Sequence, residues 1–500
     1  MRSKIVSGML IGLLAVLSIA AGIPAQDRLA AHEKPEQPGS AVRFKTLFTF
    51  DNADGAEPEV ALVQGTDGNL YGTAYAGGLY DNGTVFKITP QGALTTIYNF
   101  CAQTNCPDGN EPDAALTLGT DGNFYGTTYF GGANADACQT GCGVVFKITP
   151  AGAMTTLYSF CALPGCADGA APGALVQGND GNFYGTILEG GSANCVNTCG
   201  TVFKITPAGV LTTLYKFTGA DAGGYYPNSF ERLVQGTDGN FYGTTTFGGP
   251  ASGCGGSTCG TVFKITPEGA LTTLYNFQGG AGESENPGGD LIQATDGNFY
   301  GNAGGGYFNS TCFDSCGTIF KMTPEGVVTT LVSLDGTDGV GPVGLIQATN
   351  GNFYIVAEGG GPHNSGTILE VTPEGVVTVL HDFSNGSDGS FPFSGVVQAT
   401  NGTFYGDTAS GGTIYSLSTG LGPFVESVPT AGKAGGTVKI LGNNLKFATG
   451  VTFNGVATSF TAKSGTYIEA TVPAGATTGP IVVTLPSGTL TSNVNFQVLP

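Results

Sequence analysis

Residues 233–243 have the sequence Leu-Val-Gln-Gly-Thr-Asp-Gly-Asn-Phe-Tyr-Gly, and similar stretches recur along most of the 500-residue chain. The clearest marker is Asp-Gly-Asn before an aromatic pair. It has seven copies, two of which begin with Asn in place of Asp. The copies begin at Asp67, Asp121, Asp180, Asp238, Asp296, Asn350 and Asn401. Successive copies are 51 to 59 residues apart, and repeats of this period are typical of solenoids, propellers and arrays.

Each repeat contains four short runs rich in Val, Ile, Phe, Tyr and Thr. In the second repeat they cover residues 115–118, 124–129, 144–149 and 154–160. Gly, Pro, Asn and Asp bound these runs, which is the pattern of β-strands joined by tight turns. The first pair is joined by Thr-Asp-Gly-Asn and the last pair by Pro-x-Gly, so each repeat predicts a four-stranded antiparallel sheet, the blade of a β-propeller.

The two ends of the repeat region predict a closed ring. Residues 44–50 resemble the fourth strand of a repeat, whereas the seventh repeat ends after a third strand at 413–417. We therefore expect the amino-terminal strand to complete the seventh blade, which removes the exposed edges of an open array. The two tight turns of each blade then lie on one face, and the longer loops, where binding residues are usually found, lie on the other.

Composition and charge limit the classes of partner. The chain has 85 Gly, no Trp, 11% charged residues and a formal net charge of −20. Nucleic acid and anionic membranes need basic contact surfaces, so we expect neither as a partner. Residues 1–25 have the layout of a secretory signal, with Arg2 and Lys4 before an apolar run, and residues 26–42 form a flexible leader. We expect a secreted or cell-surface monomer with no membrane span.

The repeats are similar to a known family. The segments Gly-Thr-Val-Phe-Lys-Ile-Thr-Pro-x-Gly at 200–209 and 260–269, together with residues 233–243, resemble the GloVer tandem repeat of exported bacterial proteins over residues 43–419. Residues 423–500 form short alternating strands, and Gly-Thr-Val-Lys-Ile-Leu-Gly-Asn-Asn-Leu within them resembles the IPT/TIG family of immunoglobulin-like domains. The resemblance implies a seven-bladed propeller followed by a β-sandwich, with a surface or secreted role and no established activity.

The twelve cysteines form six local pairs in the long loops. They are Cys101 and Cys106, Cys138 and Cys142, Cys161 and Cys166, Cys195 and Cys199, Cys254 and Cys259, and Cys312 and Cys316. An even count in an exported chain predicts disulfides within each pair. Metal binding is the alternative, but no pair has a His close in sequence and a tetrahedral site would need two pairs brought together.

A second motif, Asp-Gly-x-x-Pro, precedes each innermost strand. Its acidic residues are Asp54, Asp108, Asp168, Asp338 and Asp388, and Glu283 stands at the aligned place in the fifth loop. In a closed ring these carboxylates would surround one end of the axis, where they could bind a cation or a basic ligand. Alternatively, each Asp caps its own turn, the ordinary role of Asp before Gly. Lysines recur in the third strands at Lys87, Lys147, Lys204, Lys264 and Lys321, where we expect a structural role.

No catalytic constellation is evident. His32 lies in the leader, which leaves His363 and His381, and neither has a distinctive nucleophile beside it in sequence. The sequence predicts a binding or scaffold protein without a cofactor or resident metal, which contacts an extracellular protein or polysaccharide through the long-loop face. The alternatives are a carbohydrate-active hydrolase with carboxylates at the mouth of the propeller, and a purely structural surface protein.

Overall fold

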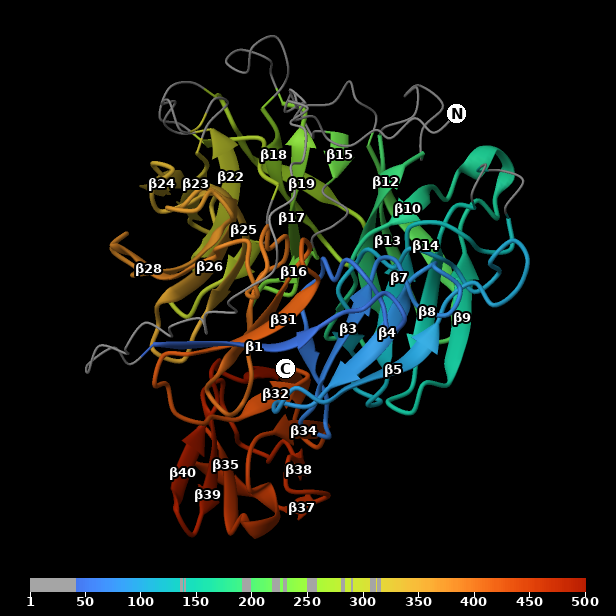
Figure 1. The fold of residues 1–500 in the computed structure, drawn as a ribbon. Helices are drawn as coiled ribbons and strands as arrows, with labels where there is room; N and C mark the ends of the chain where they lie inside the picture. Colours follow the sequence, from blue (N-terminus) through green and yellow to red (C-terminus); the bar gives the residue numbers. More distant parts are fainter. Residues whose placement is uncertain are drawn as a thin grey trace. The chain divides into compact units, whose positions relative to one another are not determined.

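The computed structural model describes residues 42–134, 138, 141–190, 199–217, 225–227, 232–249, 259–279, 284–288, 291–305, 312 and 316–500. These residues form seven antiparallel sheets of four or five strands and, at the carboxyl end, two further four-stranded sheets with a two-stranded pair (Figure 1). No α-helix occurs in the described part of the chain. The predicted signal and most of the leader lie outside the described residues.

Each of the seven sheets is one propeller blade with the predicted strand order. The first strands are β2 (Val63–Gln64), β6 (Thr117–Leu118), β11 (Val176–Gln177), β16 (Val234–Gln235), β21 (Leu291–Gln293), β25 (Val340–Gln347) and β29 (Val397–Gln398). The second strands are β3 (Leu70–Ala74), β7 (Phe124–Thr128), β12 (Phe183–Glu189), β17 (Phe241–Phe247), β22 (Phe299–Gly305), β26 (Phe353–Gly359) and β30 (Phe404–Thr408).

The third and fourth strands form the outer half of each blade. The third strands are β4 (Thr84–Ile88), β8 (Val144–Ile148), β13 (Thr201–Ile205), β18 (Thr261–Ile265), β23 (Thr318–Met322), β27 (Thr367–Val371) and β31 (Thr413–Ser418). The fourth strands are β5 (Leu94–Asn99), β9 (Met154–Ser159), β14 (Leu211–Lys216), β19 (Leu271–Asn276), β24 (Val328–Ser333), β28 (Val377–Asp382) and β1 (Arg43–Thr49). Three blades add a short strand before the first, namely β10 (Ala170–Pro172), β15 (Tyr225–Pro227) and β20 (Ser284–Glu285).

Ring closure across the chain ends is confirmed. The amino-terminal strand β1 pairs antiparallel with β31, with Phe44 opposite Leu417 and Thr49 opposite Thr413 (Figure 1). It is the outermost strand of the blade that contains β29, β30 and β31. The seventh and first blades are also joined, because the backbone N–H of Thr400 donates to Oε1 of Gln64 at 2.8 Å.

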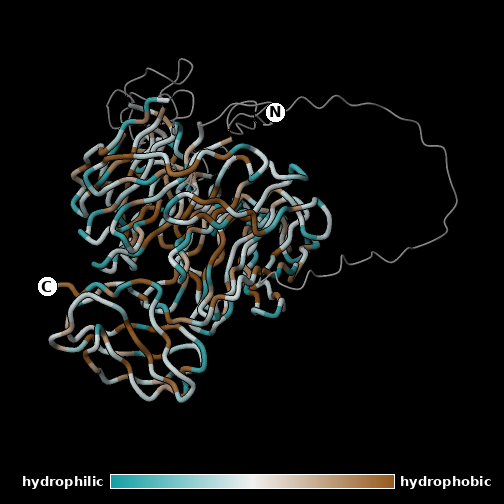
Figure 2. The backbone as a smooth tube through the Cα atoms, turned by 90° about the vertical axis from the view of Figure 1, so that its left-hand side faces the viewer, coloured by the Kyte–Doolittle hydropathy of each residue, from teal (hydrophilic) through white to brown (hydrophobic). Residues whose placement is uncertain are grey.

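Aromatic rings join successive blades. The Tyr of each Phe-Tyr pair packs on the Phe of the next blade, with centroid distances from 3.9 to 4.3 Å. The same Tyr hydroxyl donates to the Asp of its own turn, as Tyr125 does to Asp121 at 3.0 Å. At the closing boundary, Tyr405 meets Leu70 in place of Phe. The recurring marker therefore forms a turn and also a contact between blades. Apolar residues lie inside the sheets, and polar residues lie at the turns (Figure 2).

Two of the recurring lysines form ion pairs with the turn aspartates. Lys147 Nζ lies 2.7 Å from Asp121 Oδ2, and the fifth blade has an equivalent pair. Where Asn350 replaces the aspartate in the sixth blade, Glu370 replaces the lysine and accepts a hydrogen bond from the Tyr354 hydroxyl at 3.0 Å. In this blade, an amide thus replaces the acid at the turn and an acid replaces the lysine in the third strand. The Tyr hydroxyl keeps a hydrogen-bond acceptor.

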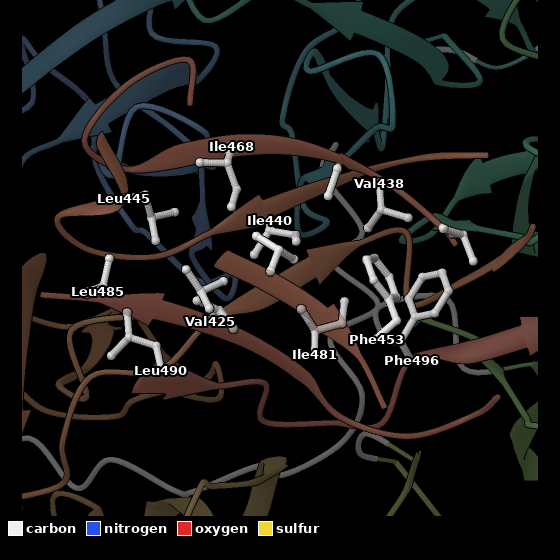
Figure 3. Packing of buried hydrophobic residues seen from close by; sticks show 14 residues of the cluster. Val425, Val438, Ile440, Leu445, Phe453, Ile468, Ile481, Leu485, Leu490 and Phe496 are labelled. Carbon is white, nitrogen blue, oxygen red and sulfur yellow. The ribbon is translucent and has the colours of Figure 1, made fainter. Parts of the chain in front are cut away.

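The carboxyl-terminal module is the predicted β-sandwich. One four-stranded sheet has the order β32 (Glu426–Val428), β34 (Thr437–Leu441), β38 (Tyr467–Thr471) and β37 (Phe460–Ala462). The second has the order β36 (Val456–Thr458), β35 (Gly450–Phe453), β39 (Ile481–Leu485) and β40 (Gly488–Thr491). In addition, β33 (Ala431–Lys433) pairs with β41 (Gln497–Leu499). Ile440, Phe453, Ile468, Ile481 and Phe496 point into one core between the sheets (Figure 3).

The segment at 451–457 of this module forms two strands and not a single one. Asn454 and Gly455 have φ values of 43° and 82° and reverse the chain between β35 and β36. Asn-Gly is the strongest short hairpin signal, so the sequence contained the information.

Removal of residues 27–50 should open the ring, because the outer edge of β31 then loses its partner. We expect a lower melting temperature and oligomers in light scattering. Removal of residues 27–41 alone leaves β1 intact and is the matched control. A monomeric 27–50 deletion that melts at the parent temperature would contradict ring closure as a source of stability.

The ion pair of the second blade should make a pH-dependent contribution. Desolvation raises the pKa of Asp121, but hydrogen bonds from Lys147, Asn123 and Tyr125 outweigh it and lower that pKa to about 2. A lowered carboxyl pKa stabilises the fold above the unfolded value, and this contribution is lost as the pH falls toward the folded value. In a double-mutant cycle of Asp121→Asn and Lys147→Met, we expect a coupling of about 0.2 to 1 kcal/mol at pH 7.

The cycle is measured by urea unfolding, and the coupling should fall steadily between pH 4 and about pH 2. A coupling that keeps its pH 7 value at the lower limit would show that the two side chains interact through packing and not through charge.

Candidate functional site

The predicted carboxylates of the Asp-Gly-x-x-Pro motif are bonded within their own loops. Asp108 Oδ2 accepts hydrogen bonds from the Tyr98 hydroxyl at 2.8 Å and from the Cys101 N–H at 3.1 Å. Asp168 is buried and likewise accepts hydrogen bonds from a Tyr hydroxyl and from two backbone N–H groups. Asp54, Asp338 and Asp388 accept from N–H groups two to four residues earlier in the chain. These contacts are those of turn caps, and Glu283 lies outside the described residues. A ligand role for these carboxylates stays a prediction.

Four of the predicted cysteine pairs are disulfides in the described part of the chain. They are Cys101–Cys106, Cys138–Cys142, Cys161–Cys166 and Cys312–Cys316. Cys199 and Cys259 are also disulfide-bonded, and their predicted partners, Cys195 and Cys254, lie outside the described residues. Three of these loops also contact the next blade, because the carbonyls of Cys142, Cys259 and Cys316 accept hydrogen bonds from its Asp-Gly-x-x-Pro segment.

The two histidines have local acidic partners. His363 Nδ1 hydrogen-bonds to Asp382 Oδ2, which joins the loop after β26 to the end of β28. His381 occupies the strand position that Tyr98 has in the first blade, and its Nε2 lies 3.3 Å from Asp388 Oδ2. Burial lowers the pKa of His381, against the opposing effect of Asp388, and its ring stacks on Phe44 at 3.6 Å. Both contacts fit the structural roles of loop fastening and core packing.

The sequence interpretation overlooked a second set of carboxylates beside the same motif. Glu59 and Asp113 directly follow the motif prolines of the first and second blades, and Asp407 stands in β30 where most blades have Thr. The residues before these prolines, Glu57 and Glu111, both have a φ of 54°. A positive φ at a residue with a side chain is uncommon and is concentrated at functional sites. The signal available in the sequence was the acidic residue after each proline.

Burial and mutual repulsion raise the pKa values of these carboxyl groups. Burial, with repulsion from Glu57, raises the pKa of Glu59 to about 7. Burial raises the pKa of Asp113 well above its usual range, and the charges of Glu59 and Glu111 raise it further. The Tyr75 hydroxyl donates to Glu111, and burial, this hydrogen bond and the nearby carboxylates raise the pKa of Tyr75. The first two blades therefore hold a group of acids at unfavourably small separations.

Asp407 extends this acidic group into the seventh blade. Its side chain has no exposure to solvent, and burial raises its pKa well above the usual range, with a smaller contribution from the charge of Glu59. Ser394 donates a hydrogen bond to Oδ1 at 2.8 Å, whereas Oδ2 has no partner among the described residues. The Tyr415 hydroxyl is also buried without a partner in this part of the chain, and burial and the charge of Asp407 raise its pKa. A buried carboxyl oxygen without a partner is costly in an interior.

Two phenylalanines stand at the equivalent positions of the seventh blade. Phe391 and Phe393 flank Pro392 as Glu57 and Glu59 flank the proline of the first blade. Their rings are 6.5 Å apart and 25° from parallel, and they are 40% and 42% exposed. Phe391 has a φ of 52°, which is a rare conformation for a bulky residue. We call Glu57, Glu59, Glu111, Asp113, Asp407, Phe391 and Phe393 the acidic mouth.

The acidic mouth can attract and desolvate a positive charge. The described parts of the five Asp-Gly-x-x-Pro segments, of the aligned segment at 283–287 and of the second-strand ends beside them contain no Lys, Arg or His. A cavity of about 280 Å³ on the tight-turn face is a weaker candidate, because its polar residues Asp121, Gln177 and Asp180 already hydrogen-bond within and between the turns. The acidic mouth instead combines carboxyl groups of raised pKa with partly exposed phenylalanines.

No helix of the described residues is sufficiently long and apolar to cross a membrane. No curated protein matches the chain. Among solved structures, a protein provisionally assigned as a gluconolactonase aligns with a TM-score of 0.37 and 12% identity over 77% of this chain and 94% of its own length.

Two family models match. The model of the IPT/TIG domain matches residues 423–498, where the β-sandwich lies. The model described as the Gloeobacter/Verrucomicrobia repeat matches residues 37–165, 135–314 and 306–440, which include all seven blades. The chain therefore belongs to the Gloeobacter/Verrucomicrobia repeat family and ends in an IPT/TIG domain.

Proposed function

We propose that this protein is a secreted or cell-surface binding protein whose acidic mouth captures ligands with protonated amines. The observation behind this proposal is the raised pKa of Glu59, Asp113 and Asp407 in a group whose surrounding segments supply no positive side chain. A bound cation would offset both the desolvation of these carboxylates and their repulsion. Disulfides and the family membership support an extracellular setting.

The aromatic rings favour an organic cation over a bare metal ion. Phe391 and Phe393 present partly exposed ring faces, and a ring face attracts an alkylammonium group through its quadrupole and its apolar surface. Glu59, Asp113 and Asp407 do not belong to a group whose ligand atoms converge within metal-binding distance in the described residues. The combination suits an amine attached to a carbon skeleton, as in amino sugars, polyamines and lysine-rich peptides.

Chitosan hexasaccharide is a suitable probe, because chitin hexasaccharide has the same skeleton without the amine charges. By calorimetry at about pH 6, where the amines of chitosan are protonated, we expect the parent protein to bind the first and not the second. The double variant Glu59→Gln/Asp113→Asn should weaken binding at least tenfold. The control variant Glu268→Gln/Glu325→Gln makes the same charge change in exposed turns of the opposite face and should bind as the parent does.

Equal affinity of the two double variants for chitosan would overturn the proposal. The same result would follow if chitin bound as strongly as chitosan in the parent, since recognition would then not depend on the amine.

Binding and stability should respond oppositely to Glu59→Gln. Because the folded pKa of Glu59 is raised to about 7, its ionisation destabilises the fold above its unfolded value of about 4.5, increasingly as the pH approaches and passes 7. The single variant should therefore melt at a higher temperature than the parent at pH 8 and at the same temperature at pH 4. Its affinity for chitosan should fall at about pH 6, where the amines of the saccharide are protonated. A variant that is less stable than the parent at pH 8 would contradict the electrostatic strain assigned to Glu59.

Hydrolysis of a glycoside is the second candidate. A carboxyl group with a pKa near 7, such as Glu59, is suited to act as a general acid at neutral pH. The same probes separate the two functions, because a hydrolase would release reducing ends from the saccharide and a binding protein would return it intact. Loss of release in Glu59→Gln, with binding retained, would support the hydrolase.

A further inference from the structure

Two disulfides from different loops meet between the second and third blades. Cys138–Cys142 lies in the loop between β7 and β8, and Cys161–Cys166 lies in the loop between β9 and β10. The sulfur atoms of Cys138 and Cys161, which are not bonded to each other, are 3.6 Å apart. All four sulfur atoms lie within 4.8 Å of one another. Two local cysteine pairs that are 19 residues apart in the sequence are thus brought into one cluster.

The spacing of this cluster fits a tetrahedral thiolate site. Zinc binds four cysteines with Zn–S distances of about 2.3 Å, which places neighbouring sulfur atoms about 3.8 Å apart. The 3.6 Å contact between Cys138 and Cys161 already has nearly this length. The two bonded distances, within Cys138–Cys142 and Cys161–Cys166, would need to lengthen by about 1.7 Å each, and the remaining sulfur–sulfur distances, all within 4.8 Å, would need to shorten by at most about 1 Å.

Hydrogen bonds independent of the disulfides hold both loops in position. The Cys161 N–H donates to the Gly169 carbonyl and the Cys166 N–H to the Leu163 carbonyl, while Asp168 accepts from two N–H groups inside the same loop. In the other loop, the Cys142 carbonyl accepts from Ala171 of the third blade at 3.0 Å. Reduction would therefore leave the four cysteines near one another, with Cys142 and Cys161 buried.

We propose that reduction of these two disulfides creates a zinc site with Cys138, Cys142, Cys161 and Cys166 as its ligands. A dithiol or phosphine reductant supplies two electrons to each disulfide, two protons are taken up, and the reductant is oxidised. The four thiols then lose their protons to solvent as their sulfur atoms bind Zn²⁺. The metal would cross-link the two loops to each other, which the disulfides, each confined to one loop, do not.

Other cysteine pairs of the chain provide internal controls. Cys101–Cys106 has the same spacing as Cys161–Cys166, and Cys312–Cys316 has the same spacing as Cys138–Cys142. Among the residues that the structure describes, neither control pair belongs to a cluster of four. If the number of residues between two cysteines alone determined zinc affinity, all pairs of the same spacing would bind zinc equally. The proposal instead predicts high affinity only for the cluster of four cysteines.

The test uses the full chain, reduced with a phosphine under anaerobic conditions, separated from the reductant and titrated with Zn²⁺ or Co²⁺. For the variant Cys101→Ser/Cys106→Ser, we expect native mass spectrometry to show one tightly bound zinc per chain after reduction and none before it. Cobalt should give the intense sulfur-to-metal charge-transfer band of a four-thiolate site. Cys138→Ser/Cys161→Ser should lower the affinity at least a hundredfold and remove this band.

Zinc retained equally by the two double variants would overturn the proposal, as would a folded, reduced chain that holds no zinc. If reduction unfolds the chain, refolding is followed by circular dichroism with and without Zn²⁺. Zinc should then restore a cooperative melt to Cys101→Ser/Cys106→Ser and not to Cys138→Ser/Cys161→Ser. An equal response of the two variants in this assay would also reject the site.

Discussion

At five boundaries between neighbouring blades, the packing depends on one contact. A proline of one blade lies against a glycine of the blade before it. A Cβ atom at Gly143 would lie 2.6 Å from Cδ of Pro172, and one at Gly366 would lie 2.6 Å from Cδ of Pro392. The same approach occurs between Gly83 and Pro112, Gly260 and Pro287, and Gly317 and Pro342. No residue other than glycine fits at this position, so the spacing of neighbouring blades is set by this contact.

This contact also explains where the backbone is strained. In five blades the residue before the proline donates its N–H to the preceding blade, as Phe391 does to the Ser365 carbonyl at 2.9 Å. In six blades this residue has a positive φ. Because the blade contact requires this backbone shape, the identity of the side chain is free to vary. Glu57, Glu111 and Phe391 occupy equivalent places, and this variation gives the acidic mouth its composition.

The two faces of the propeller use their polar groups differently. On the tight-turn face, each Asp or Asn is committed to its own turn, to a Tyr hydroxyl and in two blades to a Lys, as Asp121 is to Lys147. Such groups gain stability from their partners and have little capacity left for a ligand. On the other face, Glu59 and Asp407 have no partner of opposite charge among the residues that the structure describes, and burial keeps their pKa values raised. A site that costs stability is best explained by a ligand that relieves the cost.

The sequence by itself determined the fold and the ring. The period of the Asp-Gly-Asn marker, the four β-prone runs in each repeat and the unmatched runs at 44–50 and 413–417 depend on local propensity and on counting, which a sequence contains. The pairing of cysteines within a loop was predictable for the same reason, because the partners are four or five residues apart.

Only the tertiary structure decided which groups meet across blades. Asp108 and Asp113 are five residues apart and both follow a proline, but the first is used by its loop and the second is close to other acids. Glu59 and Asp407 are separated by most of the chain and interact only because the ring closes. The meeting of Cys138 with Cys161 likewise depends on how two loops pack. Electrostatic repulsion and burial are sums over spatial neighbours, and these neighbours exist only in the folded chain.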